Sequence, residues 1–153
     1  MRKQKIYLDT SVISCLFASE TPDRQVDTRE FWKRVKNNEF EVVLSDVTQQ
    51  EIDDCPMPKK EQMTNVLLGI AYTKLSESDG SLLLSQQYIE RGALPPKCID
   101  DALHLAIATL NSCDIVVSWN FKHLSNDRAR SIVTTVNIEN GYKPLQILPP
   151  FGV

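Results

Sequence analysis

Apolar residues along the chain follow two alternating patterns. Short runs rich in Val, Ile, Leu and aromatic residues are typical of strands, and stretches with apolar residues every three or four positions are typical of amphipathic helices. The short runs predict strands at 5–8, 40–44, 71–75, 115–119 and 145–148. The spaced stretches predict helices at 10–17, 26–37, 46–54, 59–70, 78–91, 98–111 and 126–140.

Capping and helix-breaking residues mark the ends of these elements. Caps are expected at Asp27 or Thr28 for the second helix, Ser45 for the third and Ser76 or Ser78 for the fifth. Residues 19–25 are interpreted as a loop, and Gly92 is placed to end the fifth helix. Leu82 and Leu83 are expected on the apolar side of that helix.

The alternation of strands and helices determines the expected fold class. Strands joined by helices form a parallel sheet with both faces covered, and right-handed crossovers leave few topologies. The near-continuous apolar run at 115–119 is typical of a strand buried on both faces. We therefore expect a single α/β domain over 1–153, an α/β/α sandwich around a roughly five-stranded, doubly wound parallel sheet.

Composition and charge narrow the class of protein further. With 153 residues, 42% of them apolar and 24% charged, the chain matches one globular domain. Its longest apolar stretches, such as 66–72, are too short for a membrane helix, and no signal peptide is evident, so a cytoplasmic location without membrane contact is expected. Four scattered cysteines predict neither a disulfide framework nor a zinc site, and a net charge of −3 argues against coating of nucleic acid.

Acidic residues fall where strands end and helices begin. Asp9 ends the first strand, Glu51 lies in the helix after the second, and Asp100 and Asp101 open the helix before the fourth, which Asn120 follows. These positions meet at the carboxyl edge of a parallel sheet, where open α/β sheets bind ligands. Each acid alone is most simply a helix cap or a solvated side chain. Together they predict a site for a hard cation, Mg²⁺ or Mn²⁺, which relieves carboxylate repulsion and assists phosphoryl chemistry.

Four ordered motifs strengthen this interpretation. They are YLDTSVIS at 7–14, Glu51 within QQEIDD, DALHLAIA at 101–108 and VVSWNFKHL at 116–124. In this order and spacing they resemble the motifs of the PIN-domain superfamily, whose small members include VapC-type toxins of toxin–antitoxin pairs. The resemblance implies a Mg²⁺- or Mn²⁺-dependent endoribonuclease with an RNA substrate.

The resemblance also implies roles for individual residues. Asp9, Glu51 and Asp101 match the first three acids as metal ligands, and Asp101 is preferred to Asp100 because it directly precedes the apolar run. The fourth motif departs from the family pattern, because Asn120 and His123 stand where acids are common. Asn120 is kept as a neutral catalytic-site residue, and a single metal ion is expected at rest.

Neighbouring polar residues complete the candidate site, in positions beside the ligands or the substrate. They are Thr10 and Ser11 as hydroxyl groups beside the first acid, Asp100 at a helix start, His104 on the Asp101 face of its helix, and Lys122 and His123 as substrate contacts. The simpler interpretation of His104 is a hydrogen-bonded interior residue. Lys97, Arg128 and Arg130 are further candidates for a basic rim that holds RNA.

Other functions remain as alternatives. A non-catalytic RNA- or protein-binding module is the main one, because the fourth motif is weakened. An aspartyl-phosphate enzyme lacks the DxDxT pattern here, and no phosphate-binding glycine loop is present. The family resemblance and the broad apolar faces expected for the helices at 26–37 and 59–70 imply a homodimer and a small antitoxin partner.

Overall fold

A wholly parallel, five-stranded sheet forms the centre of the computed structural model, which describes residues 2–120 and 126–153. The strands lie in the order β3-β2-β1-β4-β5, so β1 is central and the chain winds outward in both directions from it. The strands are β1 (Gln4–Leu8), β2 (Phe40–Ser45), β3 (Thr73–Leu75), β4 (Ile115–Val117) and β5 (Gln146–Leu148).

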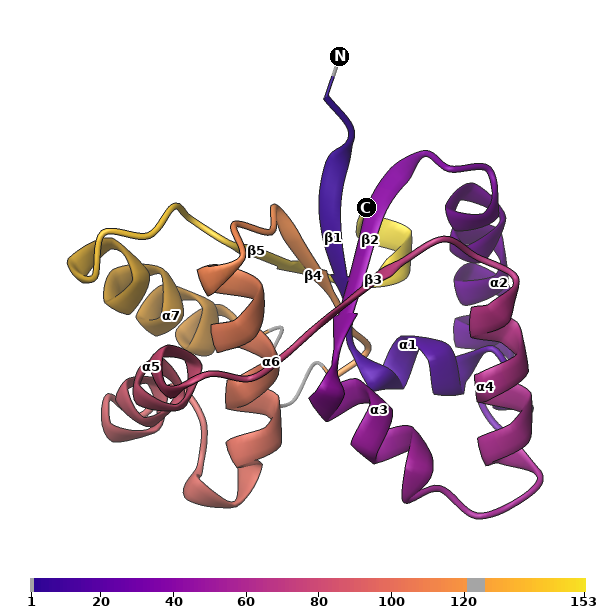
Figure 1. Ribbon diagram of the computed structural model, residues 1–153, viewed down its shortest axis with the longest axis horizontal. Coiled ribbons are helices and arrows are strands. Elements are labelled where there is room, and N and C mark those ends of the chain that lie inside the picture. Colours follow the sequence, from indigo (N-terminus) through magenta and orange to yellow (C-terminus); the bar gives the residue numbers. More distant parts are fainter. Residues whose placement is uncertain (1, 121–125) are drawn as a thin grey trace.

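Helices cover both faces of the sheet. Figure 1 shows α5, α6 and α7 on one side and α1, α2 and α4 on the other, with α3 near the lower end of the strands. The helices are α1 (Thr10–Cys15), α2 (Pro22–Lys36), α3 (Asp46–Asp53), α4 (Lys59–Leu68), α5 (Asp79–Glu90), α6 (Ile99–Leu110) and α7 (Asp127–Glu139), with short 3-10 turns η1 (Pro96–Cys98) and η2 (Pro150–Gly152). This is the doubly wound α/β class expected from the sequence.

Two apolar cores hold the layers together. Successive residues of a strand point to opposite faces, so Ile6 and Leu8 pack with the α1, α2 and α4 side whereas Tyr7 packs with α5 and α6. All side chains from Ala102 to Thr109 are buried, which makes α6 the most enclosed helix of the second core. The strands therefore lie between two apolar layers, and the polar residues at the strand ends lie at the edges of the sheet.

Several element boundaries differ from the sequence-based expectation. The second helix begins at Pro22, because proline is well tolerated at a first helical position and Asp23 favours the first turn, so the predicted loop is wrong over 22–25. Thr28, expected as a possible cap, is buried and donates to the Arg24 carbonyl at 2.6 Å. The 3-10 turn at Pro96–Cys98 replaces part of the extended loop expected around Pro95–Pro96.

The fifth helix also buries a different face than expected. Leu83 is 62% exposed and Leu82 38% exposed, while Ser81 and Ser85 are buried beside Leu84. The serine hydroxyls bond to carbonyls of the preceding turn, which permits their burial against α6. Gly92 ends the helix with φ at 81°, as its placement predicted.

Two findings concern covalent and membrane features. All four cysteines are free thiols, two of them buried. In the described part of the chain, no helix combines the length and apolar character needed to cross a membrane.

Candidate active site

Asp9 is the buried centre of the candidate site. It directly follows β1 and caps α1, and its side chain is almost fully buried. Its Oδ2 accepts hydrogen bonds from the hydroxyl groups of Ser11 at 2.5 Å and Ser118 at 3.0 Å. These bonds fix the carboxylate, and Oδ1 lies 3.5 Å from Nε2 of His104.

Glu51 reaches the same edge from α3. The helix starts at a capping box, in which Ser45 accepts from the Val47 amide. The Glu51 Oε1 atom accepts a hydrogen bond from the Thr10 hydroxyl at 2.9 Å and contacts His104 Nε2. Burial alone would raise the pKa of Glu51, but the bonds to His104 and Thr10 outweigh it, so its pKa is lowered. Glu51 is therefore ionised at neutral pH.

Asp101 supplies the third carboxylate, from the first turn of α6. Asn120 donates from Nδ2 to Asp101 Oδ2 at 3.0 Å. The segment that follows β4 therefore contacts the first turn of α6. Burial, then the negative charge of Asp9, raises the pKa of Asp101 to about 6. Asp100 instead is exposed and lines a separate pocket beside α3, so adjacent acids on α6 face different surroundings.

His104 links the acids to the interior of the protein. Its side chain is fully buried, with Nε2 toward Glu51 and Asp9 and Nδ1 at 2.5 Å from the Tyr7 hydroxyl. Burial opposes the charged ring, but the Glu51 hydrogen bond and the Asp9 charge outweigh it and raise the pKa of His104. The Tyr7 hydroxyl also bonds Ser45 at 2.6 Å, which ties the histidine to the start of α3. The histidine is thus both an interior residue and a direct neighbour of the acids.

The acidic edge can be compared with the needs of a divalent cation. Within 2–120 and 126–153, no three His, Cys, Asp or Glu side chains surround one point as metal ligands, and Glu51 is engaged by His104 and Thr10. The three carboxylates supply oxygen donors, which suit Mg²⁺ or Mn²⁺, and the Nε2 atom of His104 also lies 3.5 Å from Asp9 Oδ1. Burial is the main cause of the raised pKa of Asp101, and repulsion from Asp9, which a cation would relieve, adds to it. These carboxylates therefore have the chemistry that such an ion requires, while the described side chains do not converge on one point.

The basic residues expected near the substrate are placed differently. Lys122 and His123 lie outside the described residues. Arg128 donates to a backbone carbonyl at the end of α5 at 2.7 Å, and Arg130 pairs with an acid of its own helix. The described contacts of these two arginines are therefore with α7 and the end of α5.

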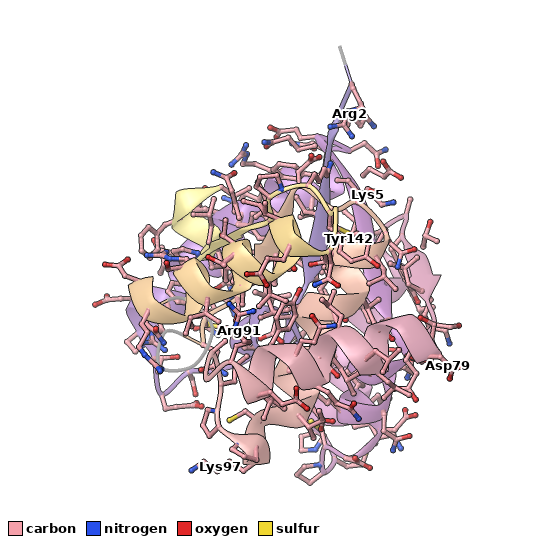
Figure 2. All side chains as sticks on the ribbon, turned by 90° about the vertical axis from the view of Figure 1, so that its left-hand side faces the viewer. Arg2, Lys5, Asp79, Arg91, Lys97 and Tyr142 are labelled. Carbon is pink, nitrogen blue, oxygen red and sulfur yellow. The ribbon has the colours of Figure 1, made fainter. Side chains whose placement is uncertain are left out.

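Two basic residues near the acids were missed by the sequence interpretation. Arg24 and Lys59 line a pocket that also contains Ser11 and Asn120. Arg24 was missed because it falls in the segment interpreted as a loop, and nothing in its local sequence indicates its neighbours. Figure 2 shows Lys97 at the lower end of the molecule, opposite Arg2.

The raised pKa of Asp101 predicts how the free energy of unfolding of the metal-free protein depends on pH. An acid whose pKa rises from 3.8 to about 6 on folding binds its proton more tightly in the native state, so stability falls as pH rises between these values. We expect a loss of up to about 2 kcal/mol by pH 7. The stabilisation from His104, whose pKa is also raised, is complete below 6.5 and adds to the loss at higher pH.

Urea unfolding at several pH values with EDTA tests this prediction. Asp101→Asn should flatten the dependence between about pH 4 and pH 6, whereas the exposed neighbour Asp100→Asn should leave it unchanged. Equal pH slopes for the two variants would show that the Asp101 carboxylate is not electrostatically strained.

Comparison with known proteins adds information on the fold. No family model and no curated protein sequence matches the chain. Among solved structures, it is similar to a chain in the crystal structure of VapBC2 from Rickettsia felis bound to a DNA fragment from their promoter, with a TM-score of 0.52 and 18% identity. The match covers 82% of this chain and 95% of that chain. This likeness and the five-stranded parallel sheet confirm the PIN-like fold.

Proposed function

We propose that this protein is a metal-dependent endoribonuclease, a VapC-like toxin that cleaves RNA at its acidic edge. The observation that carries the proposal is the position of three acids, far apart in the chain, at one edge of the sheet. Asp9 and Glu51 lie against one buried histidine, and Asp101 is close enough for the charge of Asp9 to contribute to its raised pKa. The likeness to the VapBC2 structure supports the fold on which this chemistry would operate.

The proposed ligands are Asp9, Glu51 and Asp101, with the neutral oxygen of Asn120 beside them. A bound Mg²⁺ or Mn²⁺ would stabilise negative charge on the phosphoryl group and lower the pKa of a water. Ser11 and Ser118 hold the Asp9 carboxylate in place, so it needs little rearrangement. Asn120 holds Asp101 through its side-chain amide.

His104 has a positioning role in this proposal. It bonds to Tyr7 on one side and Glu51 on the other, so it fixes the Glu51 carboxylate near the Asp9 carboxylate. The pKa of His104 is raised, so its surroundings favour the positively charged ring, which would offset the repulsion between these acids.

Cleavage of a labelled single-stranded RNA tests the function. Single strands expose their backbone to a protein edge better than a paired helix does. We expect cleavage with Mn²⁺ or Mg²⁺ and none with EDTA. If purified protein cleaves no RNA in either metal, the enzyme proposal fails, and contaminating nuclease is identified by activity in a mock purification from cells that lack the protein.

Asn120 provides a prediction about metal dependence. The Asn120 side chain carries no charge, and its amide nitrogen lies 3.0 Å from Oδ2 of Asp101. The Asn120→Asp substitution would therefore place a fourth carboxylate beside Asp101. This variant should reach half-maximal cleavage at a lower Mn²⁺ concentration, because added negative charge strengthens cation binding. Asn120→Ala should lose less activity than Asp9→Ala, which removes a charged ligand.

A Mn²⁺ titration of cleavage rate for these variants checks the assignment. An unchanged metal dependence in Asn120→Asp would contradict a place beside the metal. Activity as low in Asn120→Ala as in Asp9→Ala would indicate that Asn120 orients substrate or water directly.

One observation favours the alternative of a binding module. Glu51, a proposed ligand, is already engaged by His104 and Thr10, so the acids can be held together without a metal. A module of this kind would bind RNA or protein equally well with EDTA and with Mn²⁺, and it would leave the RNA intact. The cleavage assay above therefore separates the two candidates.

Partners follow from the proposed toxin role. The similar structure is that of VapBC2 bound to a DNA fragment from their promoter. By analogy with that complex, we propose that this chain binds a small antitoxin protein. We also propose that it forms a homodimer and acts in the cytoplasm. Val26 on α2 and Leu68 on α4 are 59% and 77% exposed, which supports apolar contacts on this side of the molecule. Light scattering of the purified chain, alone and with the product of a neighbouring small reading frame, tests both partners.

A further inference from the structure

Two pockets of opposite charge adjoin the acidic cluster. The first, of about 300 Å³, lies beside α3 and contains five acidic residues and no basic one in its described lining: Asp46, Glu51, Asp54, Glu77 and Asp100. The second, of about 330 Å³, lies between α1 and the starts of α2 and α4, and its lining contains two basic residues, Arg24 and Lys59, and one acid, Glu20. The second pocket also includes Ser11 and Asn120, so it opens directly beside Asp9 and Asp101.

Arg24 is held at a defined place in the second pocket. Its guanidinium carbon lies 5.2 Å from the centre of the Trp119 ring, a cation–π contact. The Trp119 indole donates to the buried Thr28 hydroxyl at 2.8 Å. Its backbone amide donates to Ser11 at 3.0 Å, and Ser11 bonds Asp9. A continuous set of contacts thus fixes the guanidinium relative to the acid at the centre of the site.

A guanidinium stacked on an aromatic ring suits phosphate recognition. Arginine is the side chain that proteins most often combine with an aromatic face and a phosphate group, and Arg24 lies over the ring of Trp119. Lys59 at the start of α4 supplies a second positive charge across the same pocket. The volume of this pocket is at the lower end of the range for pockets that hold small ligands, which begins at about 300 Å³. A pocket of this size is on the scale of one nucleotide unit.

We infer that the RNA strand crosses the site over this Arg24–Lys59 pocket, with a phosphate next to the scissile one bound between the two side chains. The inference rests on the proposed function in taking RNA as the ligand. The acidic pocket beside α3 repels a polyanion and directs the strand away from that side. The site therefore has a basic entry side and an acidic side that the strand avoids.

Binding of a non-cleavable 2′-O-methyl RNA oligonucleotide, measured by fluorescence anisotropy in EDTA, tests the path of the strand. Arg24→Ala/Lys59→Ala should weaken binding by about fivefold or more at low salt. Losing two phosphate contacts on a single strand should also reduce the salt slope by about 1.4. The matched control is Lys33→Ala/Lys36→Ala, which removes the same charge from the opposite end of α2 and should leave affinity nearly unchanged.

The outcomes are distinguishable from failure of the enzyme proposal, because this assay requires neither metal nor cleavage. Selective loss in the Arg24/Lys59 variant supports the path even if the wild-type protein cleaves nothing. Equal loss in both double variants would indicate general charge attraction and overturn the inference. No loss in the Arg24/Lys59 variant, or no binding of the oligonucleotide to wild-type protein, would also overturn it.

Discussion

Replacing Asp9 by Asn is expected to lower Mn²⁺-dependent RNA cleavage by about 100-fold or more. Asp9 is the most enclosed of the three acids, and its Oδ1 faces the other site residues. The substitution removes one negative charge from the proposed metal site but keeps the size and shape of the side chain. Cation binding and the stabilisation of phosphoryl charge should therefore fail together.

The fold should survive this substitution. The Asn side-chain oxygen can still accept hydrogen bonds from Ser11 and Ser118 and can cap α1. Removing the Asp9 charge also relieves part of the repulsion that raises the pKa of Asp101. We expect a melting temperature close to that of the wild-type protein in EDTA. Wild-type cleavage by a folded Asp9→Asn variant would contradict the assignment of Asp9, and Asp100→Asn is the matched active control.

Replacing His104 by Ala is expected to destabilise the protein by about 3 kcal/mol. The ring is fully buried and lies between Tyr7 and the two acids Asp9 and Glu51. Its removal leaves a cavity and two carboxylates close together without the group between them. A buried ion pair that loses one partner is costly because the remaining charge is left uncompensated.

A second substitution separates the positioning role of His104 from simple packing. His104→Gln retains an amide donor that can contact Glu51, so it should recover part of the stability and of the Mn²⁺ affinity lost in His104→Ala. Thr109→Val is the control, because Thr109 is a buried polar residue of the same helix that bonds to Tyr88, away from the acids. It should lower stability without changing Mn²⁺ affinity. Equal Mn²⁺ affinity in wild type and both His104 variants, measured where they are folded, would exclude the positioning role.

The fold and the acidic edge could be predicted because they depend on local patterns. The apolar run of β4, the capping Ser45 of α3 and the alternation of strands with helices are each visible within a few residues. The parallel arrangement then brings Asp9, Glu51 and Asp101 to one edge without further information. The preference for Asp101 over Asp100 came from the family resemblance, whereas helical geometry required only that two adjacent residues point in different directions.

The contacts that determine how the site works could not be predicted in this way. His104 meets Tyr7 and Glu51 across 97 and 53 residues of sequence, and no local signal distinguishes it from an ordinary interior histidine. Arg24 reaches the site only because α2 begins at Pro22 and Trp119 lies beneath its side chain. Such contacts depend on packing between distant elements, which local patterns do not encode.

The central claim is that Asp9 and its neighbouring acids bind a divalent cation at the carboxyl edge of the sheet. Calorimetric titration of Mn²⁺ into the wild-type protein and the Asp9→Asn variant, both without RNA, tests it most directly. We expect saturable binding of one ion per wild-type chain and binding weaker by about tenfold or more in Asp9→Asn. Absence of binding to the folded wild-type protein, or equal affinity in the two proteins, would contradict the claim.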